Sequence, residues 1–229
     1  MSSDDLFAHL GSPEPALDPA NTPKRRVDQP LADRLRPSTL DEYRGQEHLL
    51  GEDGPLRRLI EADRIPSMML WGPPGSGKTT LALLIARATA SDFVALSAVT
   101  ATLKDIRQVV DTAKLNRQYA RRTILFLDEI HRFNKAQQDG LLPHAESGLV
   151  TLIGATTENP SFSVIAPLLS RCRVFTLNAL GGDHLEAMLA RGLADLNALS
   201  GGAELALAAE AASAVVQLAD GDGRRALGM

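Results

Sequence analysis

The sequence predicts an α/β fold in which a parallel β-sheet lies between helices. Two observations carry this prediction. From residue 31 to about residue 180, short apolar runs alternate with stretches of helical periodicity, which is the pattern of parallel strands joined by crossover helices. The run 123–127 contains four consecutive apolar residues, and such a run is typical of a strand that is buried on both faces of a parallel sheet.

The expected strands are apolar runs bounded by proline, glycine or polar residues. They cover residues 67–71, 93–96, 123–127, 150–154 and 174–177. A helix should follow the first strand, because Leu81, Leu84 and Ile85 recur at helical spacing. Thr102 is placed to cap the next helix, which carries apolar residues at the same spacing.

The two ends of the chain differ from the α/β part. Residues 1–30 contain five scattered prolines and no apolar periodicity, so we expect a disordered tail there. After residue 181 only helical signals remain, at about 183–199 and 204–219. The sequence therefore predicts an α/β domain over residues 31–180 and a second, helical part over residues 181–229.

Composition excludes several classes of protein. The chain has 229 residues, of which 44% are hydrophobic, so it has room for one large domain with a core. No apolar run approaches 18 residues and the acidic N-terminus leads into none, so we expect neither a membrane span nor a secretory signal. A single cysteine excludes an internal disulfide and favours a cytoplasmic location. The net charge of −4 argues against a protein that coats nucleic acid by charge alone.

A glycine-rich turn after the first strand matches the pattern G-x-x-x-x-G-K-[ST]. Gly75 and Gly77 allow backbone N–H groups to surround phosphates without interference from a Cβ atom. The next helix directs its positive N-terminal end toward the same place. Lys78 adds a full charge near the β- and γ-phosphates, and the Thr79 hydroxyl is placed to ligate Mg²⁺. The candidate nucleotide-binding residues here are Gly72, Pro73, Pro74, Gly75, Ser76, Gly77, Lys78, Thr79 and Thr80.

Two acidic residues, Asp128 and Glu129, end the most apolar strand. Hard cations prefer oxygen ligands, so Asp128 is the candidate for the Mg²⁺ shell, directly or through water. Glu129 is the candidate catalytic residue that orients and polarises the attacking water. We expect Glu129→Gln to keep nucleotide affinity and to lose turnover. His131 is a weaker candidate for the base.

The runs 128–139 and 153–162 are the most specific stretches of the chain. With the glycine-rich turn, they resemble the clamp-loader-like branch of the AAA+ ATPases. Within that branch they are most similar to the replication-associated recombination group, which is related to the Werner helicase-interacting protein. The resemblance implies a P-loop core with ATP and Mg²⁺ as cofactors and a five-stranded sheet of order 5-1-4-3-2. It also implies a helical lid that is incomplete, because the chain stops at Met229 in what resembles the sensor 2 helix, as an N-terminal fragment would.

The same resemblance assigns an adenine-binding segment to residues 31–46. Its matching landmarks are Arg36-Pro37 and Gly45-Gln46, all counted among the candidate nucleotide-binding residues. Arg44 departs from the apolar residue that many relatives have at this place. Thr157, at the end of the fourth strand, matches sensor 1, with Asn159 as the alternative.

Two arginines acquire roles by the resemblance. Arg171 matches an arginine that reaches into the site of a neighbouring subunit, and Arg224, with Arg225 as the alternative, matches sensor 2. Simpler interpretations remain open: Arg171 could pair with a local carboxylate, Arg224 could be a helix-surface charge, and Thr157 could cap a strand end. The catalytic candidates are thus Glu129, Arg171, Thr157 and Lys78.

By the resemblance, the function expected is Mg²⁺-dependent ATP hydrolysis on DNA at stalled or damaged replication forks. The implied partners of the intact protein are DNA with fork, gap or end structures, further copies of the chain, single-stranded DNA-binding protein and the replication machinery. The implied location is cytoplasmic and nucleoid-associated, without a membrane partner. The alternative is a clamp-loader-type or branch-migration subunit that binds nucleotide, DNA and partners with little hydrolysis of its own.

Overall fold

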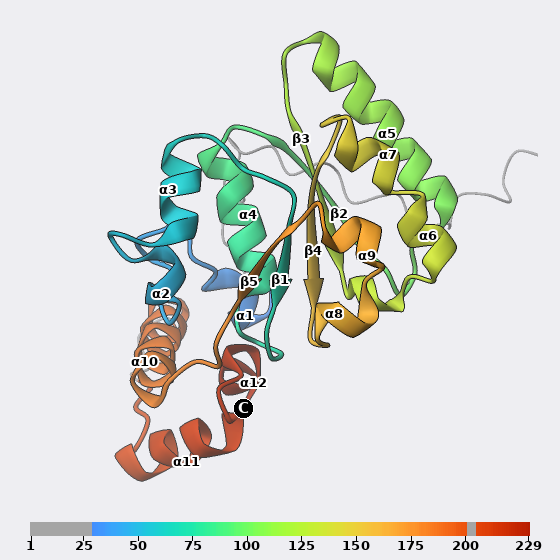
Figure 1. Cartoon of the computed structure of the whole chain (residues 1–229). Helices are drawn as coiled ribbons and strands as arrows, with labels where there is room; N and C mark the ends of the chain where they lie inside the picture. Colours follow the sequence, from blue (N-terminus) through green and yellow to red (C-terminus); the bar gives the residue numbers. More distant parts are fainter. Residues whose placement is uncertain (1–28, 201–204) are drawn as a thin grey trace, which may run out of the picture.

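The computed structural model describes residues 29–200 and 205–229, so the tail predicted for residues 1–30 lies almost entirely outside the described residues. The α/β prediction is confirmed: a five-stranded parallel sheet has the order β2-β3-β4-β1-β5, which is the expected order 5-1-4-3-2 read from the other edge (Figure 1). The strands are β1 (Met68–Trp71), β2 (Asp92–Ser97), β3 (Thr123–Asp128), β4 (Thr151–Thr156) and β5 (Arg173–Thr176).

The interior strand β3 is buried on both faces, as its composition predicts. Ile124 and Phe126 belong to the hydrophobic core on one face of the sheet, whereas Leu125 and Leu127 belong to the core on the other face. Successive side chains of a strand point to opposite faces, so an uninterrupted apolar run satisfies both cores.

Helices cover both faces of the sheet (Figure 1). On one face lie α2 (Glu47–Leu50), α3 (Pro55–Glu61) and α4 (Lys78–Ala88). The other face carries α5 (Leu103–Gln118), the 3₁₀ turn η1 (Ile130–Arg132), α6 (Lys135–Asp139), α7 (Leu142–Glu146), α8 (Pro160–Ser163) and α9 (Ala166–Leu169).

The predicted cap of α5 is confirmed. The Thr102 side chain accepts a hydrogen bond from the backbone N–H of Asp105, and the Asp105 carboxylate accepts one from the backbone N–H of Thr102. This reciprocal capping box satisfies two N–H groups that the helix itself leaves without a partner. It therefore defines the first residue of α5.

The last three helices form a separate small cluster with its own apolar contacts, and Figure 1 shows them below the sheet. They are α10 (Gly182–Leu199), α11 (Ala209–Ala219) and α12 (Gly223–Gly228). The prediction that α11 begins at about residue 204 is wrong. The Asn197 side chain accepts a hydrogen bond from the N–H of Leu205 (2.7 Å) and donates one to its carbonyl (3.0 Å). Residues 205–208 lie outside any helix, and α11 starts at Ala209.

The short helix α1 (Leu31–Arg34) joins the two parts of the chain. Arg34 makes a largely buried ion pair with Asp195 of α10 at 2.8 Å. Gly192, also on α10, lies against Leu31 and Leu35. The start of the α/β part of the sequence therefore packs on the C-terminal helices, and the division at residue 180 stays a prediction from the sequence.

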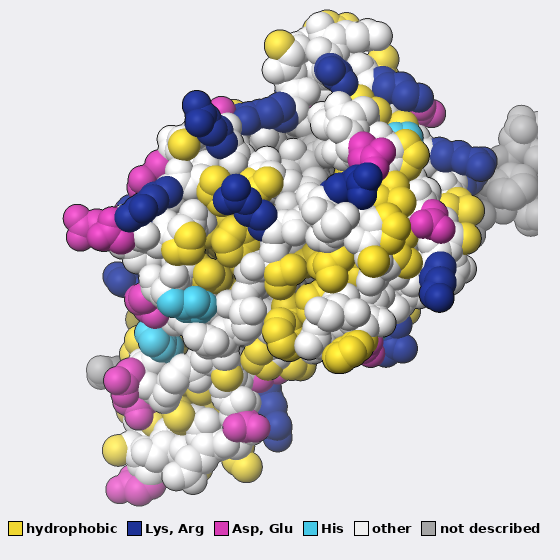
Figure 2. Space-filling view, viewed as in Figure 1, with side chains coloured by type: hydrophobic (Ala, Val, Ile, Leu, Met, Phe, Trp, Pro, Cys, Tyr) yellow, Lys and Arg dark blue, Asp and Glu magenta, His cyan; other side chains and the backbone are white. Residues whose placement is uncertain are grey.

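Charged side chains of both signs cover the surface in Figure 2, where hydrophobic side chains also gather in the middle of the visible face. Lys and Arg are more frequent on the upper part of this face, and Asp and Glu are more frequent near the C-terminal helices. Within residues 29–200 and 205–229, no helix has the length and apolar character needed to cross a bilayer.

Candidate nucleotide-binding site

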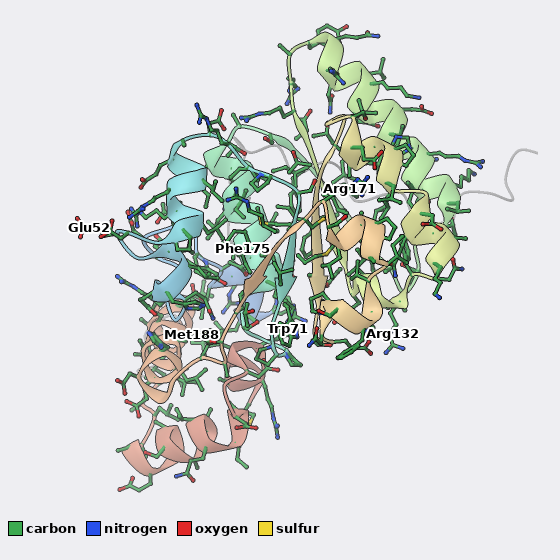
Figure 3. The ribbon with its side chains drawn as sticks, viewed as in Figure 1. Glu52, Trp71, Arg132, Arg171, Phe175 and Met188 are labelled. Atoms are coloured by element: carbon green, nitrogen blue, oxygen red, sulfur yellow. The ribbon has the colours of Figure 1, made fainter. Side chains whose placement is uncertain are left out.

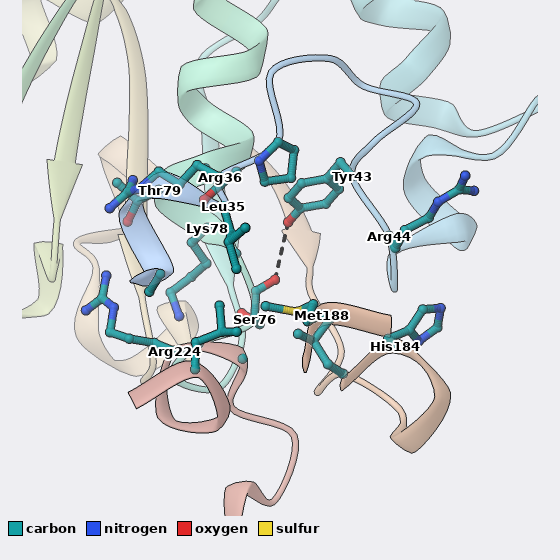
Figure 4. A pocket seen from close by; sticks show the side chains of 18 of the residues that line it. Leu35, Arg36, Tyr43, Arg44, Ser76, Lys78, Thr79, His184, Met188 and Arg224 are labelled. Carbon is teal, nitrogen blue, oxygen red and sulfur yellow. Dashed lines mark hydrogen bonds between the residues drawn. The ribbon is translucent and has the colours of Figure 1, made fainter. Parts of the chain in front are cut away.

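A cavity of about 250 Å³ lies between the carboxyl end of the sheet and the C-terminal helices. Figure 4 shows side chains from the α/β part and from α10 and α12 around it. This cavity is lined by most of the residues that the sequence assigns to nucleotide binding and hydrolysis. They are Arg36, Pro37, Pro74, Gly75, Ser76, Gly77, Lys78, Thr79, Thr80, Asp128, Glu129, Thr157 and Arg224.

The loop between β1 and α4 depends on two glycines with positive φ. Gly75 has a φ of 66° and Gly77 a φ of 95°, and both values are costly for residues that carry a Cβ atom. Gly77 is the residue before the first turn of α4. The loop therefore ends where the N–H groups of α4 are free to face an anion.

Lys78 is the first residue of α4 and is almost fully buried. Its Nζ donates hydrogen bonds to the carbonyls of Gly72 (2.8 Å) and Pro73 (2.9 Å). Burial lowers the pKa of the ammonium, and the nearby carboxylates of Glu129 and Asp128 oppose that shift. The side chain that should contact phosphate is thus held inside the loop and faces two acids.

The two acids differ in backbone conformation at the end of β3. Asp128 is the last residue of the strand, and its Oδ1 accepts a hydrogen bond from the N–H of Glu129 at 3.1 Å. Glu129 adopts a left-handed conformation with φ of 52°, which is uncommon for a residue other than glycine and is found at sites that hold a side chain in a required direction. The next residue, Ile130, is fully buried and anchors the turn.

The residues around the loop fit a magnesium ion that is shared with phosphate. Across residues 29–200 and 205–229, no group of three or more His, Cys, Asp or Glu side chains could hold a metal by itself. Mg²⁺ is usually bound through one or two protein oxygens together with substrate phosphates and water. Thr79 and Asp128 line the same cavity and supply oxygen ligands of that kind.

Tyr43 lies within the segment 31–46 and lines the cavity, but it was not singled out from the sequence. Its hydroxyl donates a hydrogen bond to the carbonyl of Ser76 at 3.2 Å (Figure 4). A Cβ atom at Gly77 would lie 2.6 Å from this hydroxyl, so the tyrosine also requires glycine at that place. The sequence indicated the segment, and the only feature that set this position apart was that it holds the one aromatic residue of residues 31–46.

The C-terminal helices contribute a second wall. Arg191, Met188 and His184 of α10 line the cavity, together with Leu180 before that helix and Leu227 of α12. Figure 4 shows Met188 and His184 on one side of the loop and Arg224 on the other. Helical periodicity predicted that α10 exists, but not which of its faces meets the loop.

Gly45 and Gln46 do not line the cavity, in contrast to Arg36 and Pro37 of the same segment. Gln46 is 1% exposed, and its side-chain amide makes two hydrogen bonds to the backbone of Asn178. Gly45 has a φ of 88° and no room for a Cβ atom beside Leu180. In this structure both residues support the wall rather than form it. Gly72 and Pro73 likewise lie behind the loop, where they accept the hydrogen bonds of Lys78.

In each pair of sensor candidates, one residue lines the cavity and the other does not. Thr157 lines it, whereas Asn159 caps α8 by accepting a hydrogen bond from the N–H of Ser161 at 2.9 Å. Arg224 lines it and Arg225 does not. The first-choice residue of each pair therefore faces the site, and the roles themselves stay predictions.

Arg171 lies outside this cavity. In Figure 3 it is at the α7–α9 side of the sheet, well separated from Met188. Its guanidinium forms an ion pair with Glu146 and donates a hydrogen bond to the carbonyl of Pro167 at 2.8 Å. The Arg171 side chain is 44% exposed. It therefore pairs with a local carboxylate and is still accessible from outside its own chain.

Comparison with known proteins identifies the family. Residues 68–179 match the family model described as ATPase family associated with various cellular activities (AAA). Replication-associated recombination protein A of Escherichia coli strain K12 is 52% identical over 199 residues, which are 87% of this chain and 44% of that protein. ATPase WRNIP1 of Dictyostelium discoideum is 45% identical over 204 residues, which are 89% of this chain and 23% of that protein. The chain spans less than half the length of these relatives.

A solved structure shows the same fold. The Thermotoga maritima RuvB Holliday junction branch migration motor superposes with a TM-score of 0.65 and 28% sequence identity, over 84% of this chain and 63% of that chain. The predicted resemblance to the AAA+ ATPases and to the recombination group is thus confirmed by sequence and by fold. On these grounds the chain belongs to the AAA family of ATPases and, within it, to the group of replication-associated recombination protein A.

Proposed function

We propose that the cavity binds ATP with Mg²⁺ and that the chain hydrolyses it. The observation that carries this proposal is the convergence of Lys78, Glu129 and Arg224 on one cavity, although they come from three different elements. A cation for the phosphates, an acid for the water and a cation from the C-terminal helices are the groups that phosphoryl transfer to water requires.

The proposed roles follow the geometry. Lys78 exchanges its two carbonyl partners for β- and γ-phosphate oxygens. Thr79 and Asp128 would hold Mg²⁺, which would neutralise negative charge on the nucleotide. Glu129 orients the attacking water and accepts its proton. Thr157 donates a hydrogen bond to the γ-phosphate or to the water. Arg224 couples α12, and with it the C-terminal helices, to the γ-phosphate.

Arg171 is proposed to complete the site of a neighbouring copy. Its distance from the cavity of its own chain and its partial exposure support a role in a second subunit. An arginine that is supplied from a neighbour can stabilise the charge that develops in the transition state, with an effect of about 10³–10⁵ on rate. We therefore infer that the active form is a homo-oligomer.

The proposed biological role comes from the relatives. Since the chain is 52% identical to a replication-associated recombination protein, we infer that the whole protein acts on DNA at stalled or damaged replication forks, in the cytoplasm and associated with the nucleoid. Fork, gap or end structures, single-stranded DNA-binding protein and the replication machinery are the proposed partners.

Hydrolysis is tested with two variants that separate binding from chemistry. Lys78→Ala should abolish the magnesium-dependent binding of ATP in calorimetry, because it removes the loop cation. Glu129→Gln should keep the ATP dissociation constant within about twofold and lower turnover by about 10²-fold or more, because only the group that activates water is lost. Lys104→Ala and Glu52→Gln, both at exposed positions, are the matched controls. Unchanged turnover in Glu129→Gln would exclude this acid from the mechanism.

A second candidate function, branch migration of DNA junctions, is favoured by the fold similarity to the RuvB motor. The two candidates differ in which DNA stimulates the ATPase. The rate of the intact protein should be compared on blunt ends, gapped duplexes, forks and four-way junctions, each with and without single-stranded DNA-binding protein. Stimulation by forks, gaps or ends supports the replication-fork role, and stimulation confined to four-way junctions supports branch migration. A rate that is independent of every DNA contradicts both.

A further inference from the structure

His131 lies directly beside the proposed catalytic acid. Its ring is largely buried, with 6% of the side chain exposed, and its Nδ1 is 3.1 Å from a carboxylate oxygen of Glu129. The same nitrogen is 3.0 Å from the hydroxyl of Thr156, the last residue of β4. One imidazole therefore contacts the ends of two neighbouring strands of the sheet.

The backbone explains why His131 returns to Glu129. Ile130, between them, is fully buried in the core, and the 3₁₀ turn η1 starts immediately after Glu129. Glu129 precedes this turn in its left-handed conformation, while Ile130 is fixed in the core. The side chains at 129 and 131 therefore meet across Ile130, as the contact between Nδ1 and the carboxylate shows.

The chemistry of the contacts determines which groups donate. A carboxylate only accepts hydrogen bonds, so a short contact with Glu129 requires the ring hydrogen on Nδ1. The Thr156 hydroxyl, which is fully buried, accepts a hydrogen bond from the N–H of Glu158 at 3.0 Å and lies 3.3 Å from the Glu158 carbonyl. Thr156 is thus a rigid anchor that is itself held by the backbone after β4.

We propose that His131 is a positioning residue that holds the Glu129 carboxylate at the carboxyl end of β4, and so fixes its separation from Thr157. This inference rests on the proposed hydrolysis of ATP. Thr157 directly follows Thr156 and lines the same cavity as Glu129. Thr156, which holds the imidazole, is thus next in the chain to the second residue that is proposed to contact the attacking water. His131 does not line the cavity, which supports an action through Glu129 rather than contact with the substrate.

The test compares two substitutions of His131, under the same assay conditions in which the unsubstituted protein hydrolyses ATP. His131→Leu removes the donor, so kcat should fall about 10- to 100-fold, since a displacement of about 1 Å in a catalytic group can have an effect of that size. The ATP dissociation constant should stay within about twofold. His131→Asn places an amide N–H near the position of Nδ1, so kcat should stay within about threefold of the parent.

Further variants separate positioning from folding. Thr156→Val keeps the shape of the anchor and removes its hydroxyl, so it should also lower kcat without a change in ATP affinity. His144→Leu, on α7 and outside the cavity, is the control and should retain parental turnover. In the Glu129→Gln background, His131→Leu should have no further effect on turnover, because a residue that acts through Glu129 has nothing left to position. If His131→Leu does not fold in a thermal-unfolding assay, His131→Asn and Thr156→Val decide the question.

Three results would overturn the inference. If His131→Leu and Thr156→Val both keep the kcat of the parent while Glu129→Gln is inactive, Glu129 does not need His131 to position its carboxylate. Equal losses in His131→Asn and His131→Leu would show that the imidazole itself transfers the proton. A parent protein that binds ATP but does not hydrolyse it, with or without DNA, would remove the proposed function and this inference together. That result is distinguishable from the first two, in which the parent is active.

Discussion

The side chain of Gln46 hydrogen-bonds to both backbone groups of Asn178, as a neighbouring β-strand would. Its Nε2 donates a hydrogen bond to the Asn178 carbonyl at 2.8 Å, and its Oε1 accepts one from the Asn178 N–H at 2.9 Å. These two residues are 132 positions apart in the sequence. The contact joins the segment before α2 to the connection between β5 and α10, and so links both walls of the nucleotide cavity.

Loss of this link should destabilise the fold. Gln46→Leu keeps the volume but leaves both backbone groups of Asn178 without their partner, and the expected loss is about 1–3 kcal/mol in the free energy of unfolding. Urea denaturation measures it. Gln108→Leu, at an exposed position of α5, is the matched control and should stay within about 0.5 kcal/mol of the parent. Equal stability of the two variants would contradict a structural role of Gln46.

Replacement of Gly75 should weaken ATP binding. A Cβ atom at this position would overlap the carboxylate of Asp222, which caps α12 by accepting hydrogen bonds from the N–H groups of Arg224 (2.9 Å) and Arg225 (3.0 Å). Gly75→Ala therefore displaces either the loop or the helix that carries Arg224. The ATP dissociation constant, measured by calorimetry, should rise about tenfold or more.

Gly148 supplies the matched control for this variant. Its φ of 62° is close to the 66° of Gly75, but a Cβ atom there would meet no other atom within 4 Å. Gly148→Ala should cost about 1 kcal/mol of stability, through the backbone alone, and leave ATP affinity unchanged. A similar loss of affinity in both variants would show that φ, rather than the contact with Asp222, determines the effect.

Arg171→Ala should leave the fold intact and remove most of the turnover. Its ion pair with Glu146 is partly exposed, and such pairs contribute about 0–1 kcal/mol. An arginine that acts in a neighbouring site contributes about 10³–10⁵ in rate. The measurement is ATPase activity after mixing Arg171→Ala with Lys78→Ala subunits. Each should be inactive alone, and the mixture should recover part of the rate, because some sites then combine an intact loop with an intact arginine. No recovery would contradict a shared site.

The thiol of Cys172 should react slowly at neutral pH. Burial disfavours the thiolate and raises the pKa of this group to about 11, so roughly 0.1% is ionised at pH 8. The rate of alkylation by iodoacetamide, followed by mass spectrometry, should rise about tenfold per pH unit between pH 7 and 10. In urea the rate at pH 8 should increase about 100-fold or more, to that of an exposed cysteine. Rapid labelling of the folded protein at pH 7 would contradict the burial.

Much of the fold and the central part of the site followed from the sequence because local physics determines them. The run 123–127 has no polar side chain that could face water after its first residue, so it had to be an interior strand. The loop that contains Gly75 and Gly77 could be identified because positive φ values and a lysine at a helix start combine in few other structures. Thr102 and Asp105 define the start of α5 through contacts within four residues of each other.

Tertiary structure alone decided the relationships that depend on distant packing. Nothing in the pattern of residues 31–46 indicates that Tyr43 lines the cavity and that Gln46 lies behind it, because both are buried by elements far away in the sequence. Likewise, the contact of His131 with Thr156 exists only because β3 and β4 are neighbours in the sheet. Side-chain direction at the end of a strand is determined by what packs against it, and that partner is chosen by the assembled sheet rather than by the residues nearby.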